Sequence, residues 1–231
     1  MIAAVIHARG GSKRIPKKNI KLFHGNPLIY YPLKIALGCD IFDRVVVSTD
    51  SKEIADIALS FGAEAPYLRP QHLADDFTPT QDVLKFDIEQ LAKDQRVSYV
   101  CCIYATAVFL RSEFILQGYE KISAHNVHTV FSVTTFPYPI FRALKLNENG
   151  SLEMFWPENR LTRSQDLQEA YHDAGQFYWV NAKRFLEKSI LYSNDAMPVI
   201  LPRYLVQDID TIEDWKRAEF MYAALKKEKI L

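Results

Sequence analysis

Short runs of apolar residues alternate with longer amphipathic segments over the first half of the chain. The apolar runs at 2–7, 44–49 and 98–105 have the length and composition of buried strands. Between them, segments such as 52–62 and 78–94 place apolar residues at helical spacing. Strands that alternate with helices in this way predict an α/β protein, a three-layer sandwich in which helices cover both faces of a mainly parallel sheet.

The alternation stops after position 135 and resumes at about position 174. In between, two short apolar segments flank Asn-Glu-Asn-Gly at 147–150, a sequence typical of a hairpin turn. We therefore predict one α/β domain from residues 1–135 and 174–231, with a Rossmann-like sheet. The inserted arm, 136–173, is expected to be a dimerisation or lid element. The last part of the domain is predicted to hold two strands and a closing helix, at 176–182, 198–202 and 211–227.

Charge and cysteine content limit the possible partners and compartments. The 231 residues carry 28 Lys+Arg and 28 Asp+Glu, and a net charge near zero argues against a general nucleic-acid binder. The cysteines, Cys39, Cys101 and Cys102, lack metal-binding spacing, which indicates free thiols in a reducing cytosol. No apolar stretch approaches the roughly 18 residues of a membrane span. We expect a cytoplasmic protein that binds neither nucleic acid nor membrane.

Basic residues concentrate in the loop after the first strand. Residues 9–21 hold six Lys or Arg side chains, no acidic one and the pair Gly10 and Gly11. A glycine-containing turn exposes backbone N–H groups to phosphate oxygens, and glycine allows a positive φ and close ligand approach. Neither the Walker pattern nor G-x-G-x-x-G is present, so the loop is either a phosphate-binding loop of another design or a solvated basic loop. Its place at the carboxyl end of a strand favours phosphate, with donors from Arg9, Ser12, Lys13, Arg14 and Lys18.

A pair of carboxylates lies near the other end of the chain. In an extended segment residues two apart face the same side, so Asp208 and Asp210 would present their carboxylates together. Such a pair suits a hard cation, Mg²⁺, which prefers oxygen ligands. Alone, an Asp-x-Asp pair is more often structural, but beside a phosphate-binding loop it predicts a metal–triphosphate site. Thr211 and Asp214 have the spacing of a helix N-cap, so we assign Asp214 to the helix.

The segment ARGGSKRIPKKNI at 8–20 resembles the N-terminal signature of the nucleotide-sugar cytidylyltransferases, the family of the CMP-sialic acid and CMP-KDO synthetases. The resemblance runs nearly end to end and implies that this loop surrounds the triphosphate of CTP. It places Asp208 and Asp210 on the family's metal aspartates, and His7, which we assign no role, where the family has proline. The nucleotide-binding residues that it implies are Ala8, Arg9, Gly10, Gly11, Ser12, Lys13, Lys18 and Asn19 for the phosphates, and Arg69 and Thr80 for the cytosine.

Sugar-site candidates come from the same resemblance. The segments 101–110 and 171–179 look most like those of family members that activate pseudaminic acid, although Val108 stands where those members have proline. Synthesis of CMP-sialic or CMP-legionaminic acid is the alternative. Aromatics such as Phe177 and Tyr178 are as well explained by burial in a strand. The sugar-binding candidates are Tyr104, Thr106 and Gln176.

The implied reaction joins CMP from CTP to a nine-carbon acidic 2-keto sugar and releases pyrophosphate. It needs positioning and charge neutralisation more than covalent help, and catalytic roles fall to Arg9, Lys18 and Asp210. The general base stays open. The family pattern also implies a homodimer in which the arm packs on the neighbour's site. Two other classes of protein remain as alternatives. One is a GT-A-like glycosyltransferase, which usually carries its Asp-x-Asp in mid-chain. The other is an inactive nucleotide-binding module, and the presence of Lys18 and both aspartates argues against it.

Overall fold

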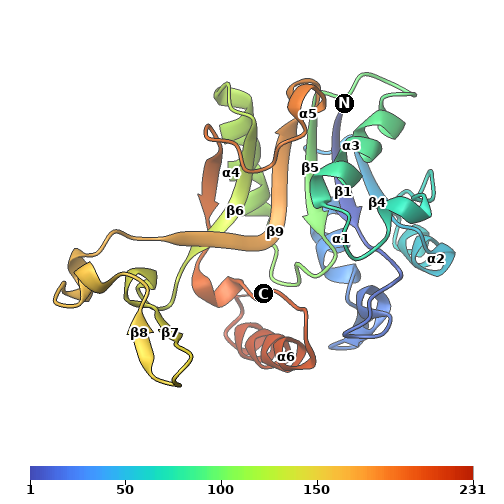
Figure 1. The fold of residues 1–231 in the computed structure, drawn as a ribbon. Helices are drawn as coiled ribbons and strands as arrows, with labels where there is room; N and C mark the ends of the chain where they lie inside the picture. Colours follow the sequence, from blue (N-terminus) through green and yellow to red (C-terminus); the bar gives the residue numbers. More distant parts are fainter. Residues whose placement is uncertain (231) are drawn as a thin grey trace.

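The computed structural model describes residues 1–230, and its centre is a six-stranded sheet (Figure 1). The strand order is β10-β6-β9-β5-β1-β4, with β9 antiparallel to both of its neighbours and the other pairs parallel. In this register Val5 of β1 lies between Val46 of β4 and Cys102 of β5. The strands are β1 (Ile2–His7), β4 (Arg44–Ser48), β5 (Tyr99–Tyr104), β6 (Thr129–Thr135), β9 (Tyr171–Asn181) and β10 (Met197–Ile200).

Helices cover both faces of the sheet because its strands are apolar on both sides. Along β1, Ala4 and Ile6 pack into one buried cluster with α1, α2, α4 and α6, and Ala3 and Val5 pack into a second with α3 and α5. This arrangement confirms the predicted three-layer sandwich. Of the helices in residues 1–230, none combines the length and apolar character that a membrane crossing needs. The helices are α1 (Tyr30–Leu37), α2 (Lys52–Ser60), α3 (Thr80–Leu91), α4 (Ser112–Ala124), α5 (Ala182–Lys188) and α6 (Ile212–Lys227).

Most predicted elements are found where they were expected. The strand predicted at 44–49 ends at Ser48, and the closing helix α6 begins after Thr211. Thr211 and Asp214 form a complete capping box, in which each side chain bonds the backbone N–H of the other. The sequence prediction missed α5 and placed the start of β9 too late, since this strand begins at Tyr171. Short 3-10 helices lie at Lys18–Ile20, Gln71–Leu73, Ile140–Arg142, Pro157–Asn159, Ser164–Asp166 and Arg203–Leu205.

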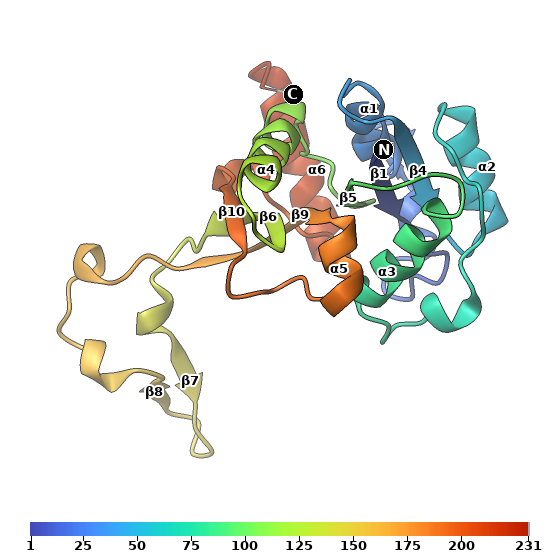
Figure 2. The same cartoon turned by 90° about the horizontal axis from the view of Figure 1, so that it is seen from above.

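The arm between β6 and β9 extends away from the sandwich in both views of the molecule (Figures 1 and 2). It carries the predicted hairpin, formed by β7 (Leu144–Leu146) and β8 (Leu152–Met154). Gly150 closes the turn with a φ of 76°, a conformation that other residues rarely adopt. Large apolar side chains of the arm are exposed, among them Tyr138, Leu146, Leu152, Phe155 and Leu161.

Aromatic packing brings the two ends of the chain together. The hairpin of β2 (Leu22–Phe23) and β3 (Asn26–Pro27) follows the basic loop, and its Phe23 side chain is fully buried. The Phe23 ring meets Trp215 and Tyr222 of α6 edge to face, with ring centroids 5.5 and 5.4 Å apart. The segment just before α6 therefore lies beside the loop that follows β1.

Candidate active site

A cleft with a volume of about 380 Å³ opens at the carboxyl ends of β1 and β5. Its walls come from the loop after β1, the segment from β4 to α3, the end of β5 and the segment before α6. Ligands of open α/β sheets bind at this edge. The predicted site residues that line the cleft are Arg9, Ser12, Lys13, Lys18, Asn19, Arg69, Thr80, Tyr104, Thr106, Asp208 and Asp210.

The loop after β1 is held by hydrogen bonds to its own chain. The Asn19 side-chain amide donates to the Arg9 carbonyl at 2.9 Å, and the Gly10 N–H donates to the Asp50 carboxylate at 2.8 Å. The expected positive φ is wrong for Gly10 and Gly11, because the glycines with positive φ in residues 1–230 lie elsewhere. Gly10 instead permits close packing, since a Cβ there would lie 3.0 Å from that of Ser51.

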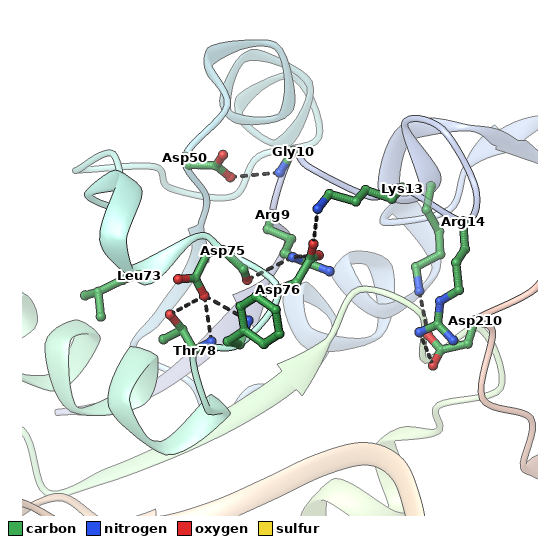
Figure 3. A network of polar contacts seen from close by, with 12 residues as sticks. Arg9, Gly10, Lys13, Arg14, Asp50, Leu73, Asp75, Asp76, Thr78 and Asp210 are labelled. Carbon is green, nitrogen blue, oxygen red and sulfur yellow. Dashed lines mark hydrogen bonds and ion pairs between the residues drawn. The ribbon is translucent and has the colours of Figure 1, made fainter.

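Two cations of this loop converge on one carboxylate in the structure (Figure 3). Arg9 Nη1 and Lys13 Nζ lie 2.6 and 2.5 Å from the two oxygens of Asp76. Hydrogen bonds from Lys13 and then Arg9 lower the pKa of Asp76. The backbone carbonyl of Asp75 also accepts a hydrogen bond from Arg9 at 2.8 Å. A carboxylate thus occupies the place at which the sequence predicts phosphate oxygens.

The basic loop and the C-terminal carboxylates are in direct contact. Lys18 Nζ donates to the Ile209 carbonyl at 2.6 Å and to Asp210 Oδ1 at 3.1 Å. Arg14 pairs with Asp210 Oδ2 at 2.8 Å (Figure 3). Burial raises the pKa of Asp210, but the hydrogen bond and charge of Lys18 with the charge of Arg14 outweigh it and lower the pKa overall. The predicted meeting of the two chain ends is present in the structure.

The two aspartates of this pair have opposite pKa shifts. Desolvation by the cleft walls, and then the charge of Asp210, raise the pKa of Asp208. Within residues 1–230, no group of three or more His, Cys, Asp or Glu side chains could hold a metal by itself. Two carboxylates that repel each other beside a phosphate-binding loop fit a cation that takes its other ligands from phosphate and water. Asp208 and Asp210 could therefore hold a divalent cation together with a bound phosphate group.

The opposite end of the cleft is less exposed to solvent. Arg69 is only 6% exposed, and its Nη2 donates to the Ser48 carbonyl at 2.7 Å. The hydroxyls of Thr80 and Tyr104 lie 2.8 Å apart, and burial raises the pKa of Tyr104. These polar groups, largely buried, suit a planar base with specific hydrogen-bonding edges.

Four predicted site residues lie outside the cleft lining. Ala8 is fully buried, and Gly10 and Gly11 are not among the residues that line the cleft. Gln176 is 3% exposed, and its side-chain N–H donates to the Leu205 carbonyl at 2.6 Å. Its Oε1 atom is buried and has no hydrogen-bond partner in residues 1–230. A direct contact of Gln176 with sugar stays a prediction.

Sequence reasoning missed three polar residues around the cleft: Asp76, Ser48 and Asp87. Asp87 is fully buried on α3, where it accepts a hydrogen bond from His7 at 2.7 Å. A signal was available, because Asp87 lies on the same face of the helix as Val83 and Leu84, where an apolar residue is expected. A charged residue in such a position indicates a specific partner.

Comparison with known proteins agrees with the geometry. The chain is 46% and 44% identical, over 94% of its own length and of theirs, to two proteins named pseudaminic acid cytidylyltransferase from Campylobacter jejuni serotypes O:2 and O:23/36. Its fold resembles that of a CMP:2-keto-3-deoxy-manno-octonic acid synthetase solved with CTP, with a TM-score of 0.70, 15% identity and coverage of 96% of this chain and 98% of that one. A family model described as Cytidylyltransferase matches residues 3–222. The chain belongs to the cytidylyltransferase family.

Proposed function

We propose that this enzyme transfers CMP from CTP to pseudaminic acid, with release of pyrophosphate. The observation that carries the proposal is the convergence of a basic loop and a pair of aspartates on one cleft. Lys18, which contacts both Ile209 and Asp210, joins the two parts. The identity of the sugar rests on the similarity to the Campylobacter proteins, which are named for pseudaminic acid.

We assign different parts of the cleft lining to the two parts of the nucleotide. Arg9, Lys13 and Lys18 would bind the triphosphate. Arg69 and Thr80 would bind the cytosine. The sugar would enter beside Tyr104 and Thr106, on the wall formed by the end of β5.

The anomeric hydroxyl of the sugar attacks the α-phosphorus, and the bond to the departing pyrophosphate breaks in line with the attack. Such transfers depend on positioning and on the stabilisation of spreading negative charge. Lys18 is suited to this task because its ammonium is fixed by the Ile209 carbonyl and the Asp210 carboxylate before the nucleotide arrives. Arg9 and Lys13 stabilise the leaving group after the triphosphate has displaced Asp76.

Asp208 and Asp210 would hold Mg²⁺ in the complex with nucleotide. Bound there, the ion would neutralise charge on the phosphate oxygens. The carboxylates also need to stay ionised, and the lowered pKa of Asp210 keeps this side chain negative near neutral pH. Arg14 would leave Oδ2 of Asp210 to the ion, while Lys18 keeps its contact with Oδ1.

We also propose that the enzyme is a cytosolic homodimer. Within residues 1–230, the arm contributes no residue to the cleft of its own chain, yet it exposes apolar side chains such as Leu146, Leu152 and Phe155. Packing this arm against a second copy would remove that apolar surface from water. Sedimentation or gel filtration should show a dimer at micromolar protein, and a monomer there would contradict the assembly.

Pyrophosphate release tests the proposed reaction. The enzyme is incubated with CTP, Mg²⁺ and one of pseudaminic, N-acetylneuraminic or legionaminic acid. We expect release that requires a sugar and is fastest with pseudaminic acid. Faster release with another sugar would reassign the substrate. CTP binding without turnover would favour an inactive module, and loss of CMP from a CMP-sugar in the presence of an acceptor would favour a glycosyltransferase.

A further inference from the structure

A fully buried carboxylate lies directly behind Arg69, at the part of the cleft that we assign to the base and call the base end (Arg69 and Thr80). Asp87 of α3 accepts hydrogen bonds from His7 Nε2 at 2.7 Å, the Ser48 hydroxyl at 2.6 Å and the Tyr67 hydroxyl at 3.0 Å. These donors come from β1, β4 and the segment between α2 and α3. One side chain of α3 is therefore bonded to three separate parts of the chain beside the cleft. A buried charge that is bonded on this scale keeps its surroundings in one arrangement.

The hydrogen bonds that connect Arg69 to Asp87 through Ser48 have a fixed direction. A serine hydroxyl has one hydrogen, and that of Ser48 is donated to Asp87. The Ser48 oxygen therefore accepts from Arg69, whose Nε and Nη2 both lie 3.2 Å away. The Ser48 backbone carbonyl accepts from Nη2 as well, at 2.7 Å. Asp87 orients Ser48, and Ser48 holds one side of the guanidinium.

The other side of the guanidinium keeps a hydrogen to donate. Nη1 carries two N–H groups, and its one acceptor in residues 1–230 is the Leu73 carbonyl at a long 3.5 Å. Arg69 lines the cleft although it is only 6% exposed, and Nη1 is the guanidinium nitrogen that keeps a hydrogen for a ligand. The result is one N–H donor in a nearly fixed position.

We propose that Asp87 is a positioning residue which, through Ser48, fixes the Arg69 donor so that the cleft accepts cytosine and rejects uracil. The proposal rests on the proposed function in two respects, that CTP is the nucleotide and that its base meets Arg69. Cytosine offers an unprotonated N3 acceptor beside its O2 carbonyl, whereas uracil places an N–H donor at that position. A fixed donor opposite an N–H group leaves both unpaired in a desolvated site, and sites of this type discriminate strongly.

Calorimetric titration of CTP and UTP, with Mg²⁺ and without sugar, tests the proposal. The proteins are the wild type, Ser48→Ala and Asp87→Asn. Thr129→Val is the control, because it too removes a buried, hydrogen-bonded hydroxyl, which donates to the Leu191 carbonyl, and Thr129 lies on β6, outside the cleft lining. We expect the wild type and the control to prefer CTP. In Ser48→Ala and in Asp87→Asn, the Kd for UTP divided by the Kd for CTP should be at least about tenfold smaller than in the wild type.

Several outcomes would overturn the proposal. One is a wild type that binds the two nucleotides equally, and another is a variant that weakens both to the same extent, as a merely structural role of Asp87 predicts. If Asp87→Asn does not fold, the titration of Ser48→Ala alone decides the proposal, since that variant keeps the Asp87 carboxylate. The titration needs no turnover, so selective CTP binding by a protein that releases no pyrophosphate with any sugar would refute the proposed reaction and leave this inference standing.

Discussion

The cleft holds its cationic side chains in two different ways. At the phosphate end, Lys13 and Arg14 have side chains that are 81% and 65% exposed, and they pair with Asp76 and Asp210. At the base end, Arg69 is 6% exposed and is bonded to buried atoms of Ser48. Exposed ion pairs contribute little to stability, and their side chains exchange partners easily. A desolvated hydrogen-bond network, by contrast, keeps its side chains in one arrangement. The difference suggests that phosphates replace existing partners, while the base meets a surface that is already in place.

The largest effect is expected at Asp210, where the two chain ends join. Asp210→Asn retains an oxygen that can accept from Lys18 but removes the negative charge that Mg²⁺ needs. We expect kcat to fall by at least about a thousandfold, while CTP still binds in part. Steady-state kinetics and calorimetry measure the two effects, and near-normal kcat would show that the metal assignment is wrong.

A smaller but still large effect is expected for Lys18, the cation of the phosphate end that is already fixed. Lys18→Ala should lower kcat by about a hundredfold or more, because a preorganised donor to the developing charge is lost. The matched control is Lys17→Ala, since Lys17 pairs with Glu53 and does not line the cleft. Equal rates for the two variants would place charge stabilisation elsewhere.

Asp76 tests whether the triphosphate replaces a carboxylate as the partner of Arg9 and Lys13. Asp76→Asn removes the charge that competes with the triphosphate for Arg9 and Lys13, so the KM for CTP should fall by a few-fold at low salt. The effect should shrink at about 0.5 M salt because screening weakens exposed pairs. Asp56→Asn, on the exposed side of α2, changes the net charge equally and should leave KM unaltered. An increase in KM would show that Asp76 assists nucleotide binding.

The smallest effect is a pH dependence of stability at the base end. Burial lowers the pKa of His7 below its usual 6.5, against the hydrogen bond and charge of Asp87, and the nearby charge of Arg69 lowers it further. Cys102 also faces the ring, at 3.5 Å. Below pH 6.5 the unfolded chain binds a proton at this histidine that the folded chain does not. The free energy of unfolding therefore decreases as the pH is lowered through that range.

The measurement for His7 is the Tm between pH 7.5 and 5.5. We expect the wild type to lose a few degrees more than His7→Gln, which cannot titrate. Parallel curves for the two proteins would mean that His7 does not remain neutral in the folded state.

The two ends of the cleft also differed in how well the sequence predicted them. The basic loop of the cleft was predicted because Arg9, Lys13 and Lys18 are crowded into it, and the strand before it is plainly apolar. The sheet and its helices, except α5, followed from the same periodicity, and the arm followed from its interruption. The reversed direction of β9 did not, because an apolar strand has the same pattern in either direction.

The base end could be seen only in part. Arg69 and Thr80 were found through resemblance to a family, whereas the role of Ser48 depends on contacts between residues far apart in the chain. Asp87 needed the structure as well, although its charge on an apolar helix face was a usable sign. The pairing of Asp76 with the basic loop depends on how the segment before α3 folds back, which no local pattern determines.

A crystal structure with CTP and Mg²⁺ is the most direct test of the account. It predicts that the phosphates take the place of the Asp76 carboxylate against Arg9 and Lys13, with the ion at Asp208 and Asp210. The contacts of Arg69 with Ser48 should be the same as in the free protein. A triphosphate bound elsewhere, with Asp76 still paired to both cations, would contradict it.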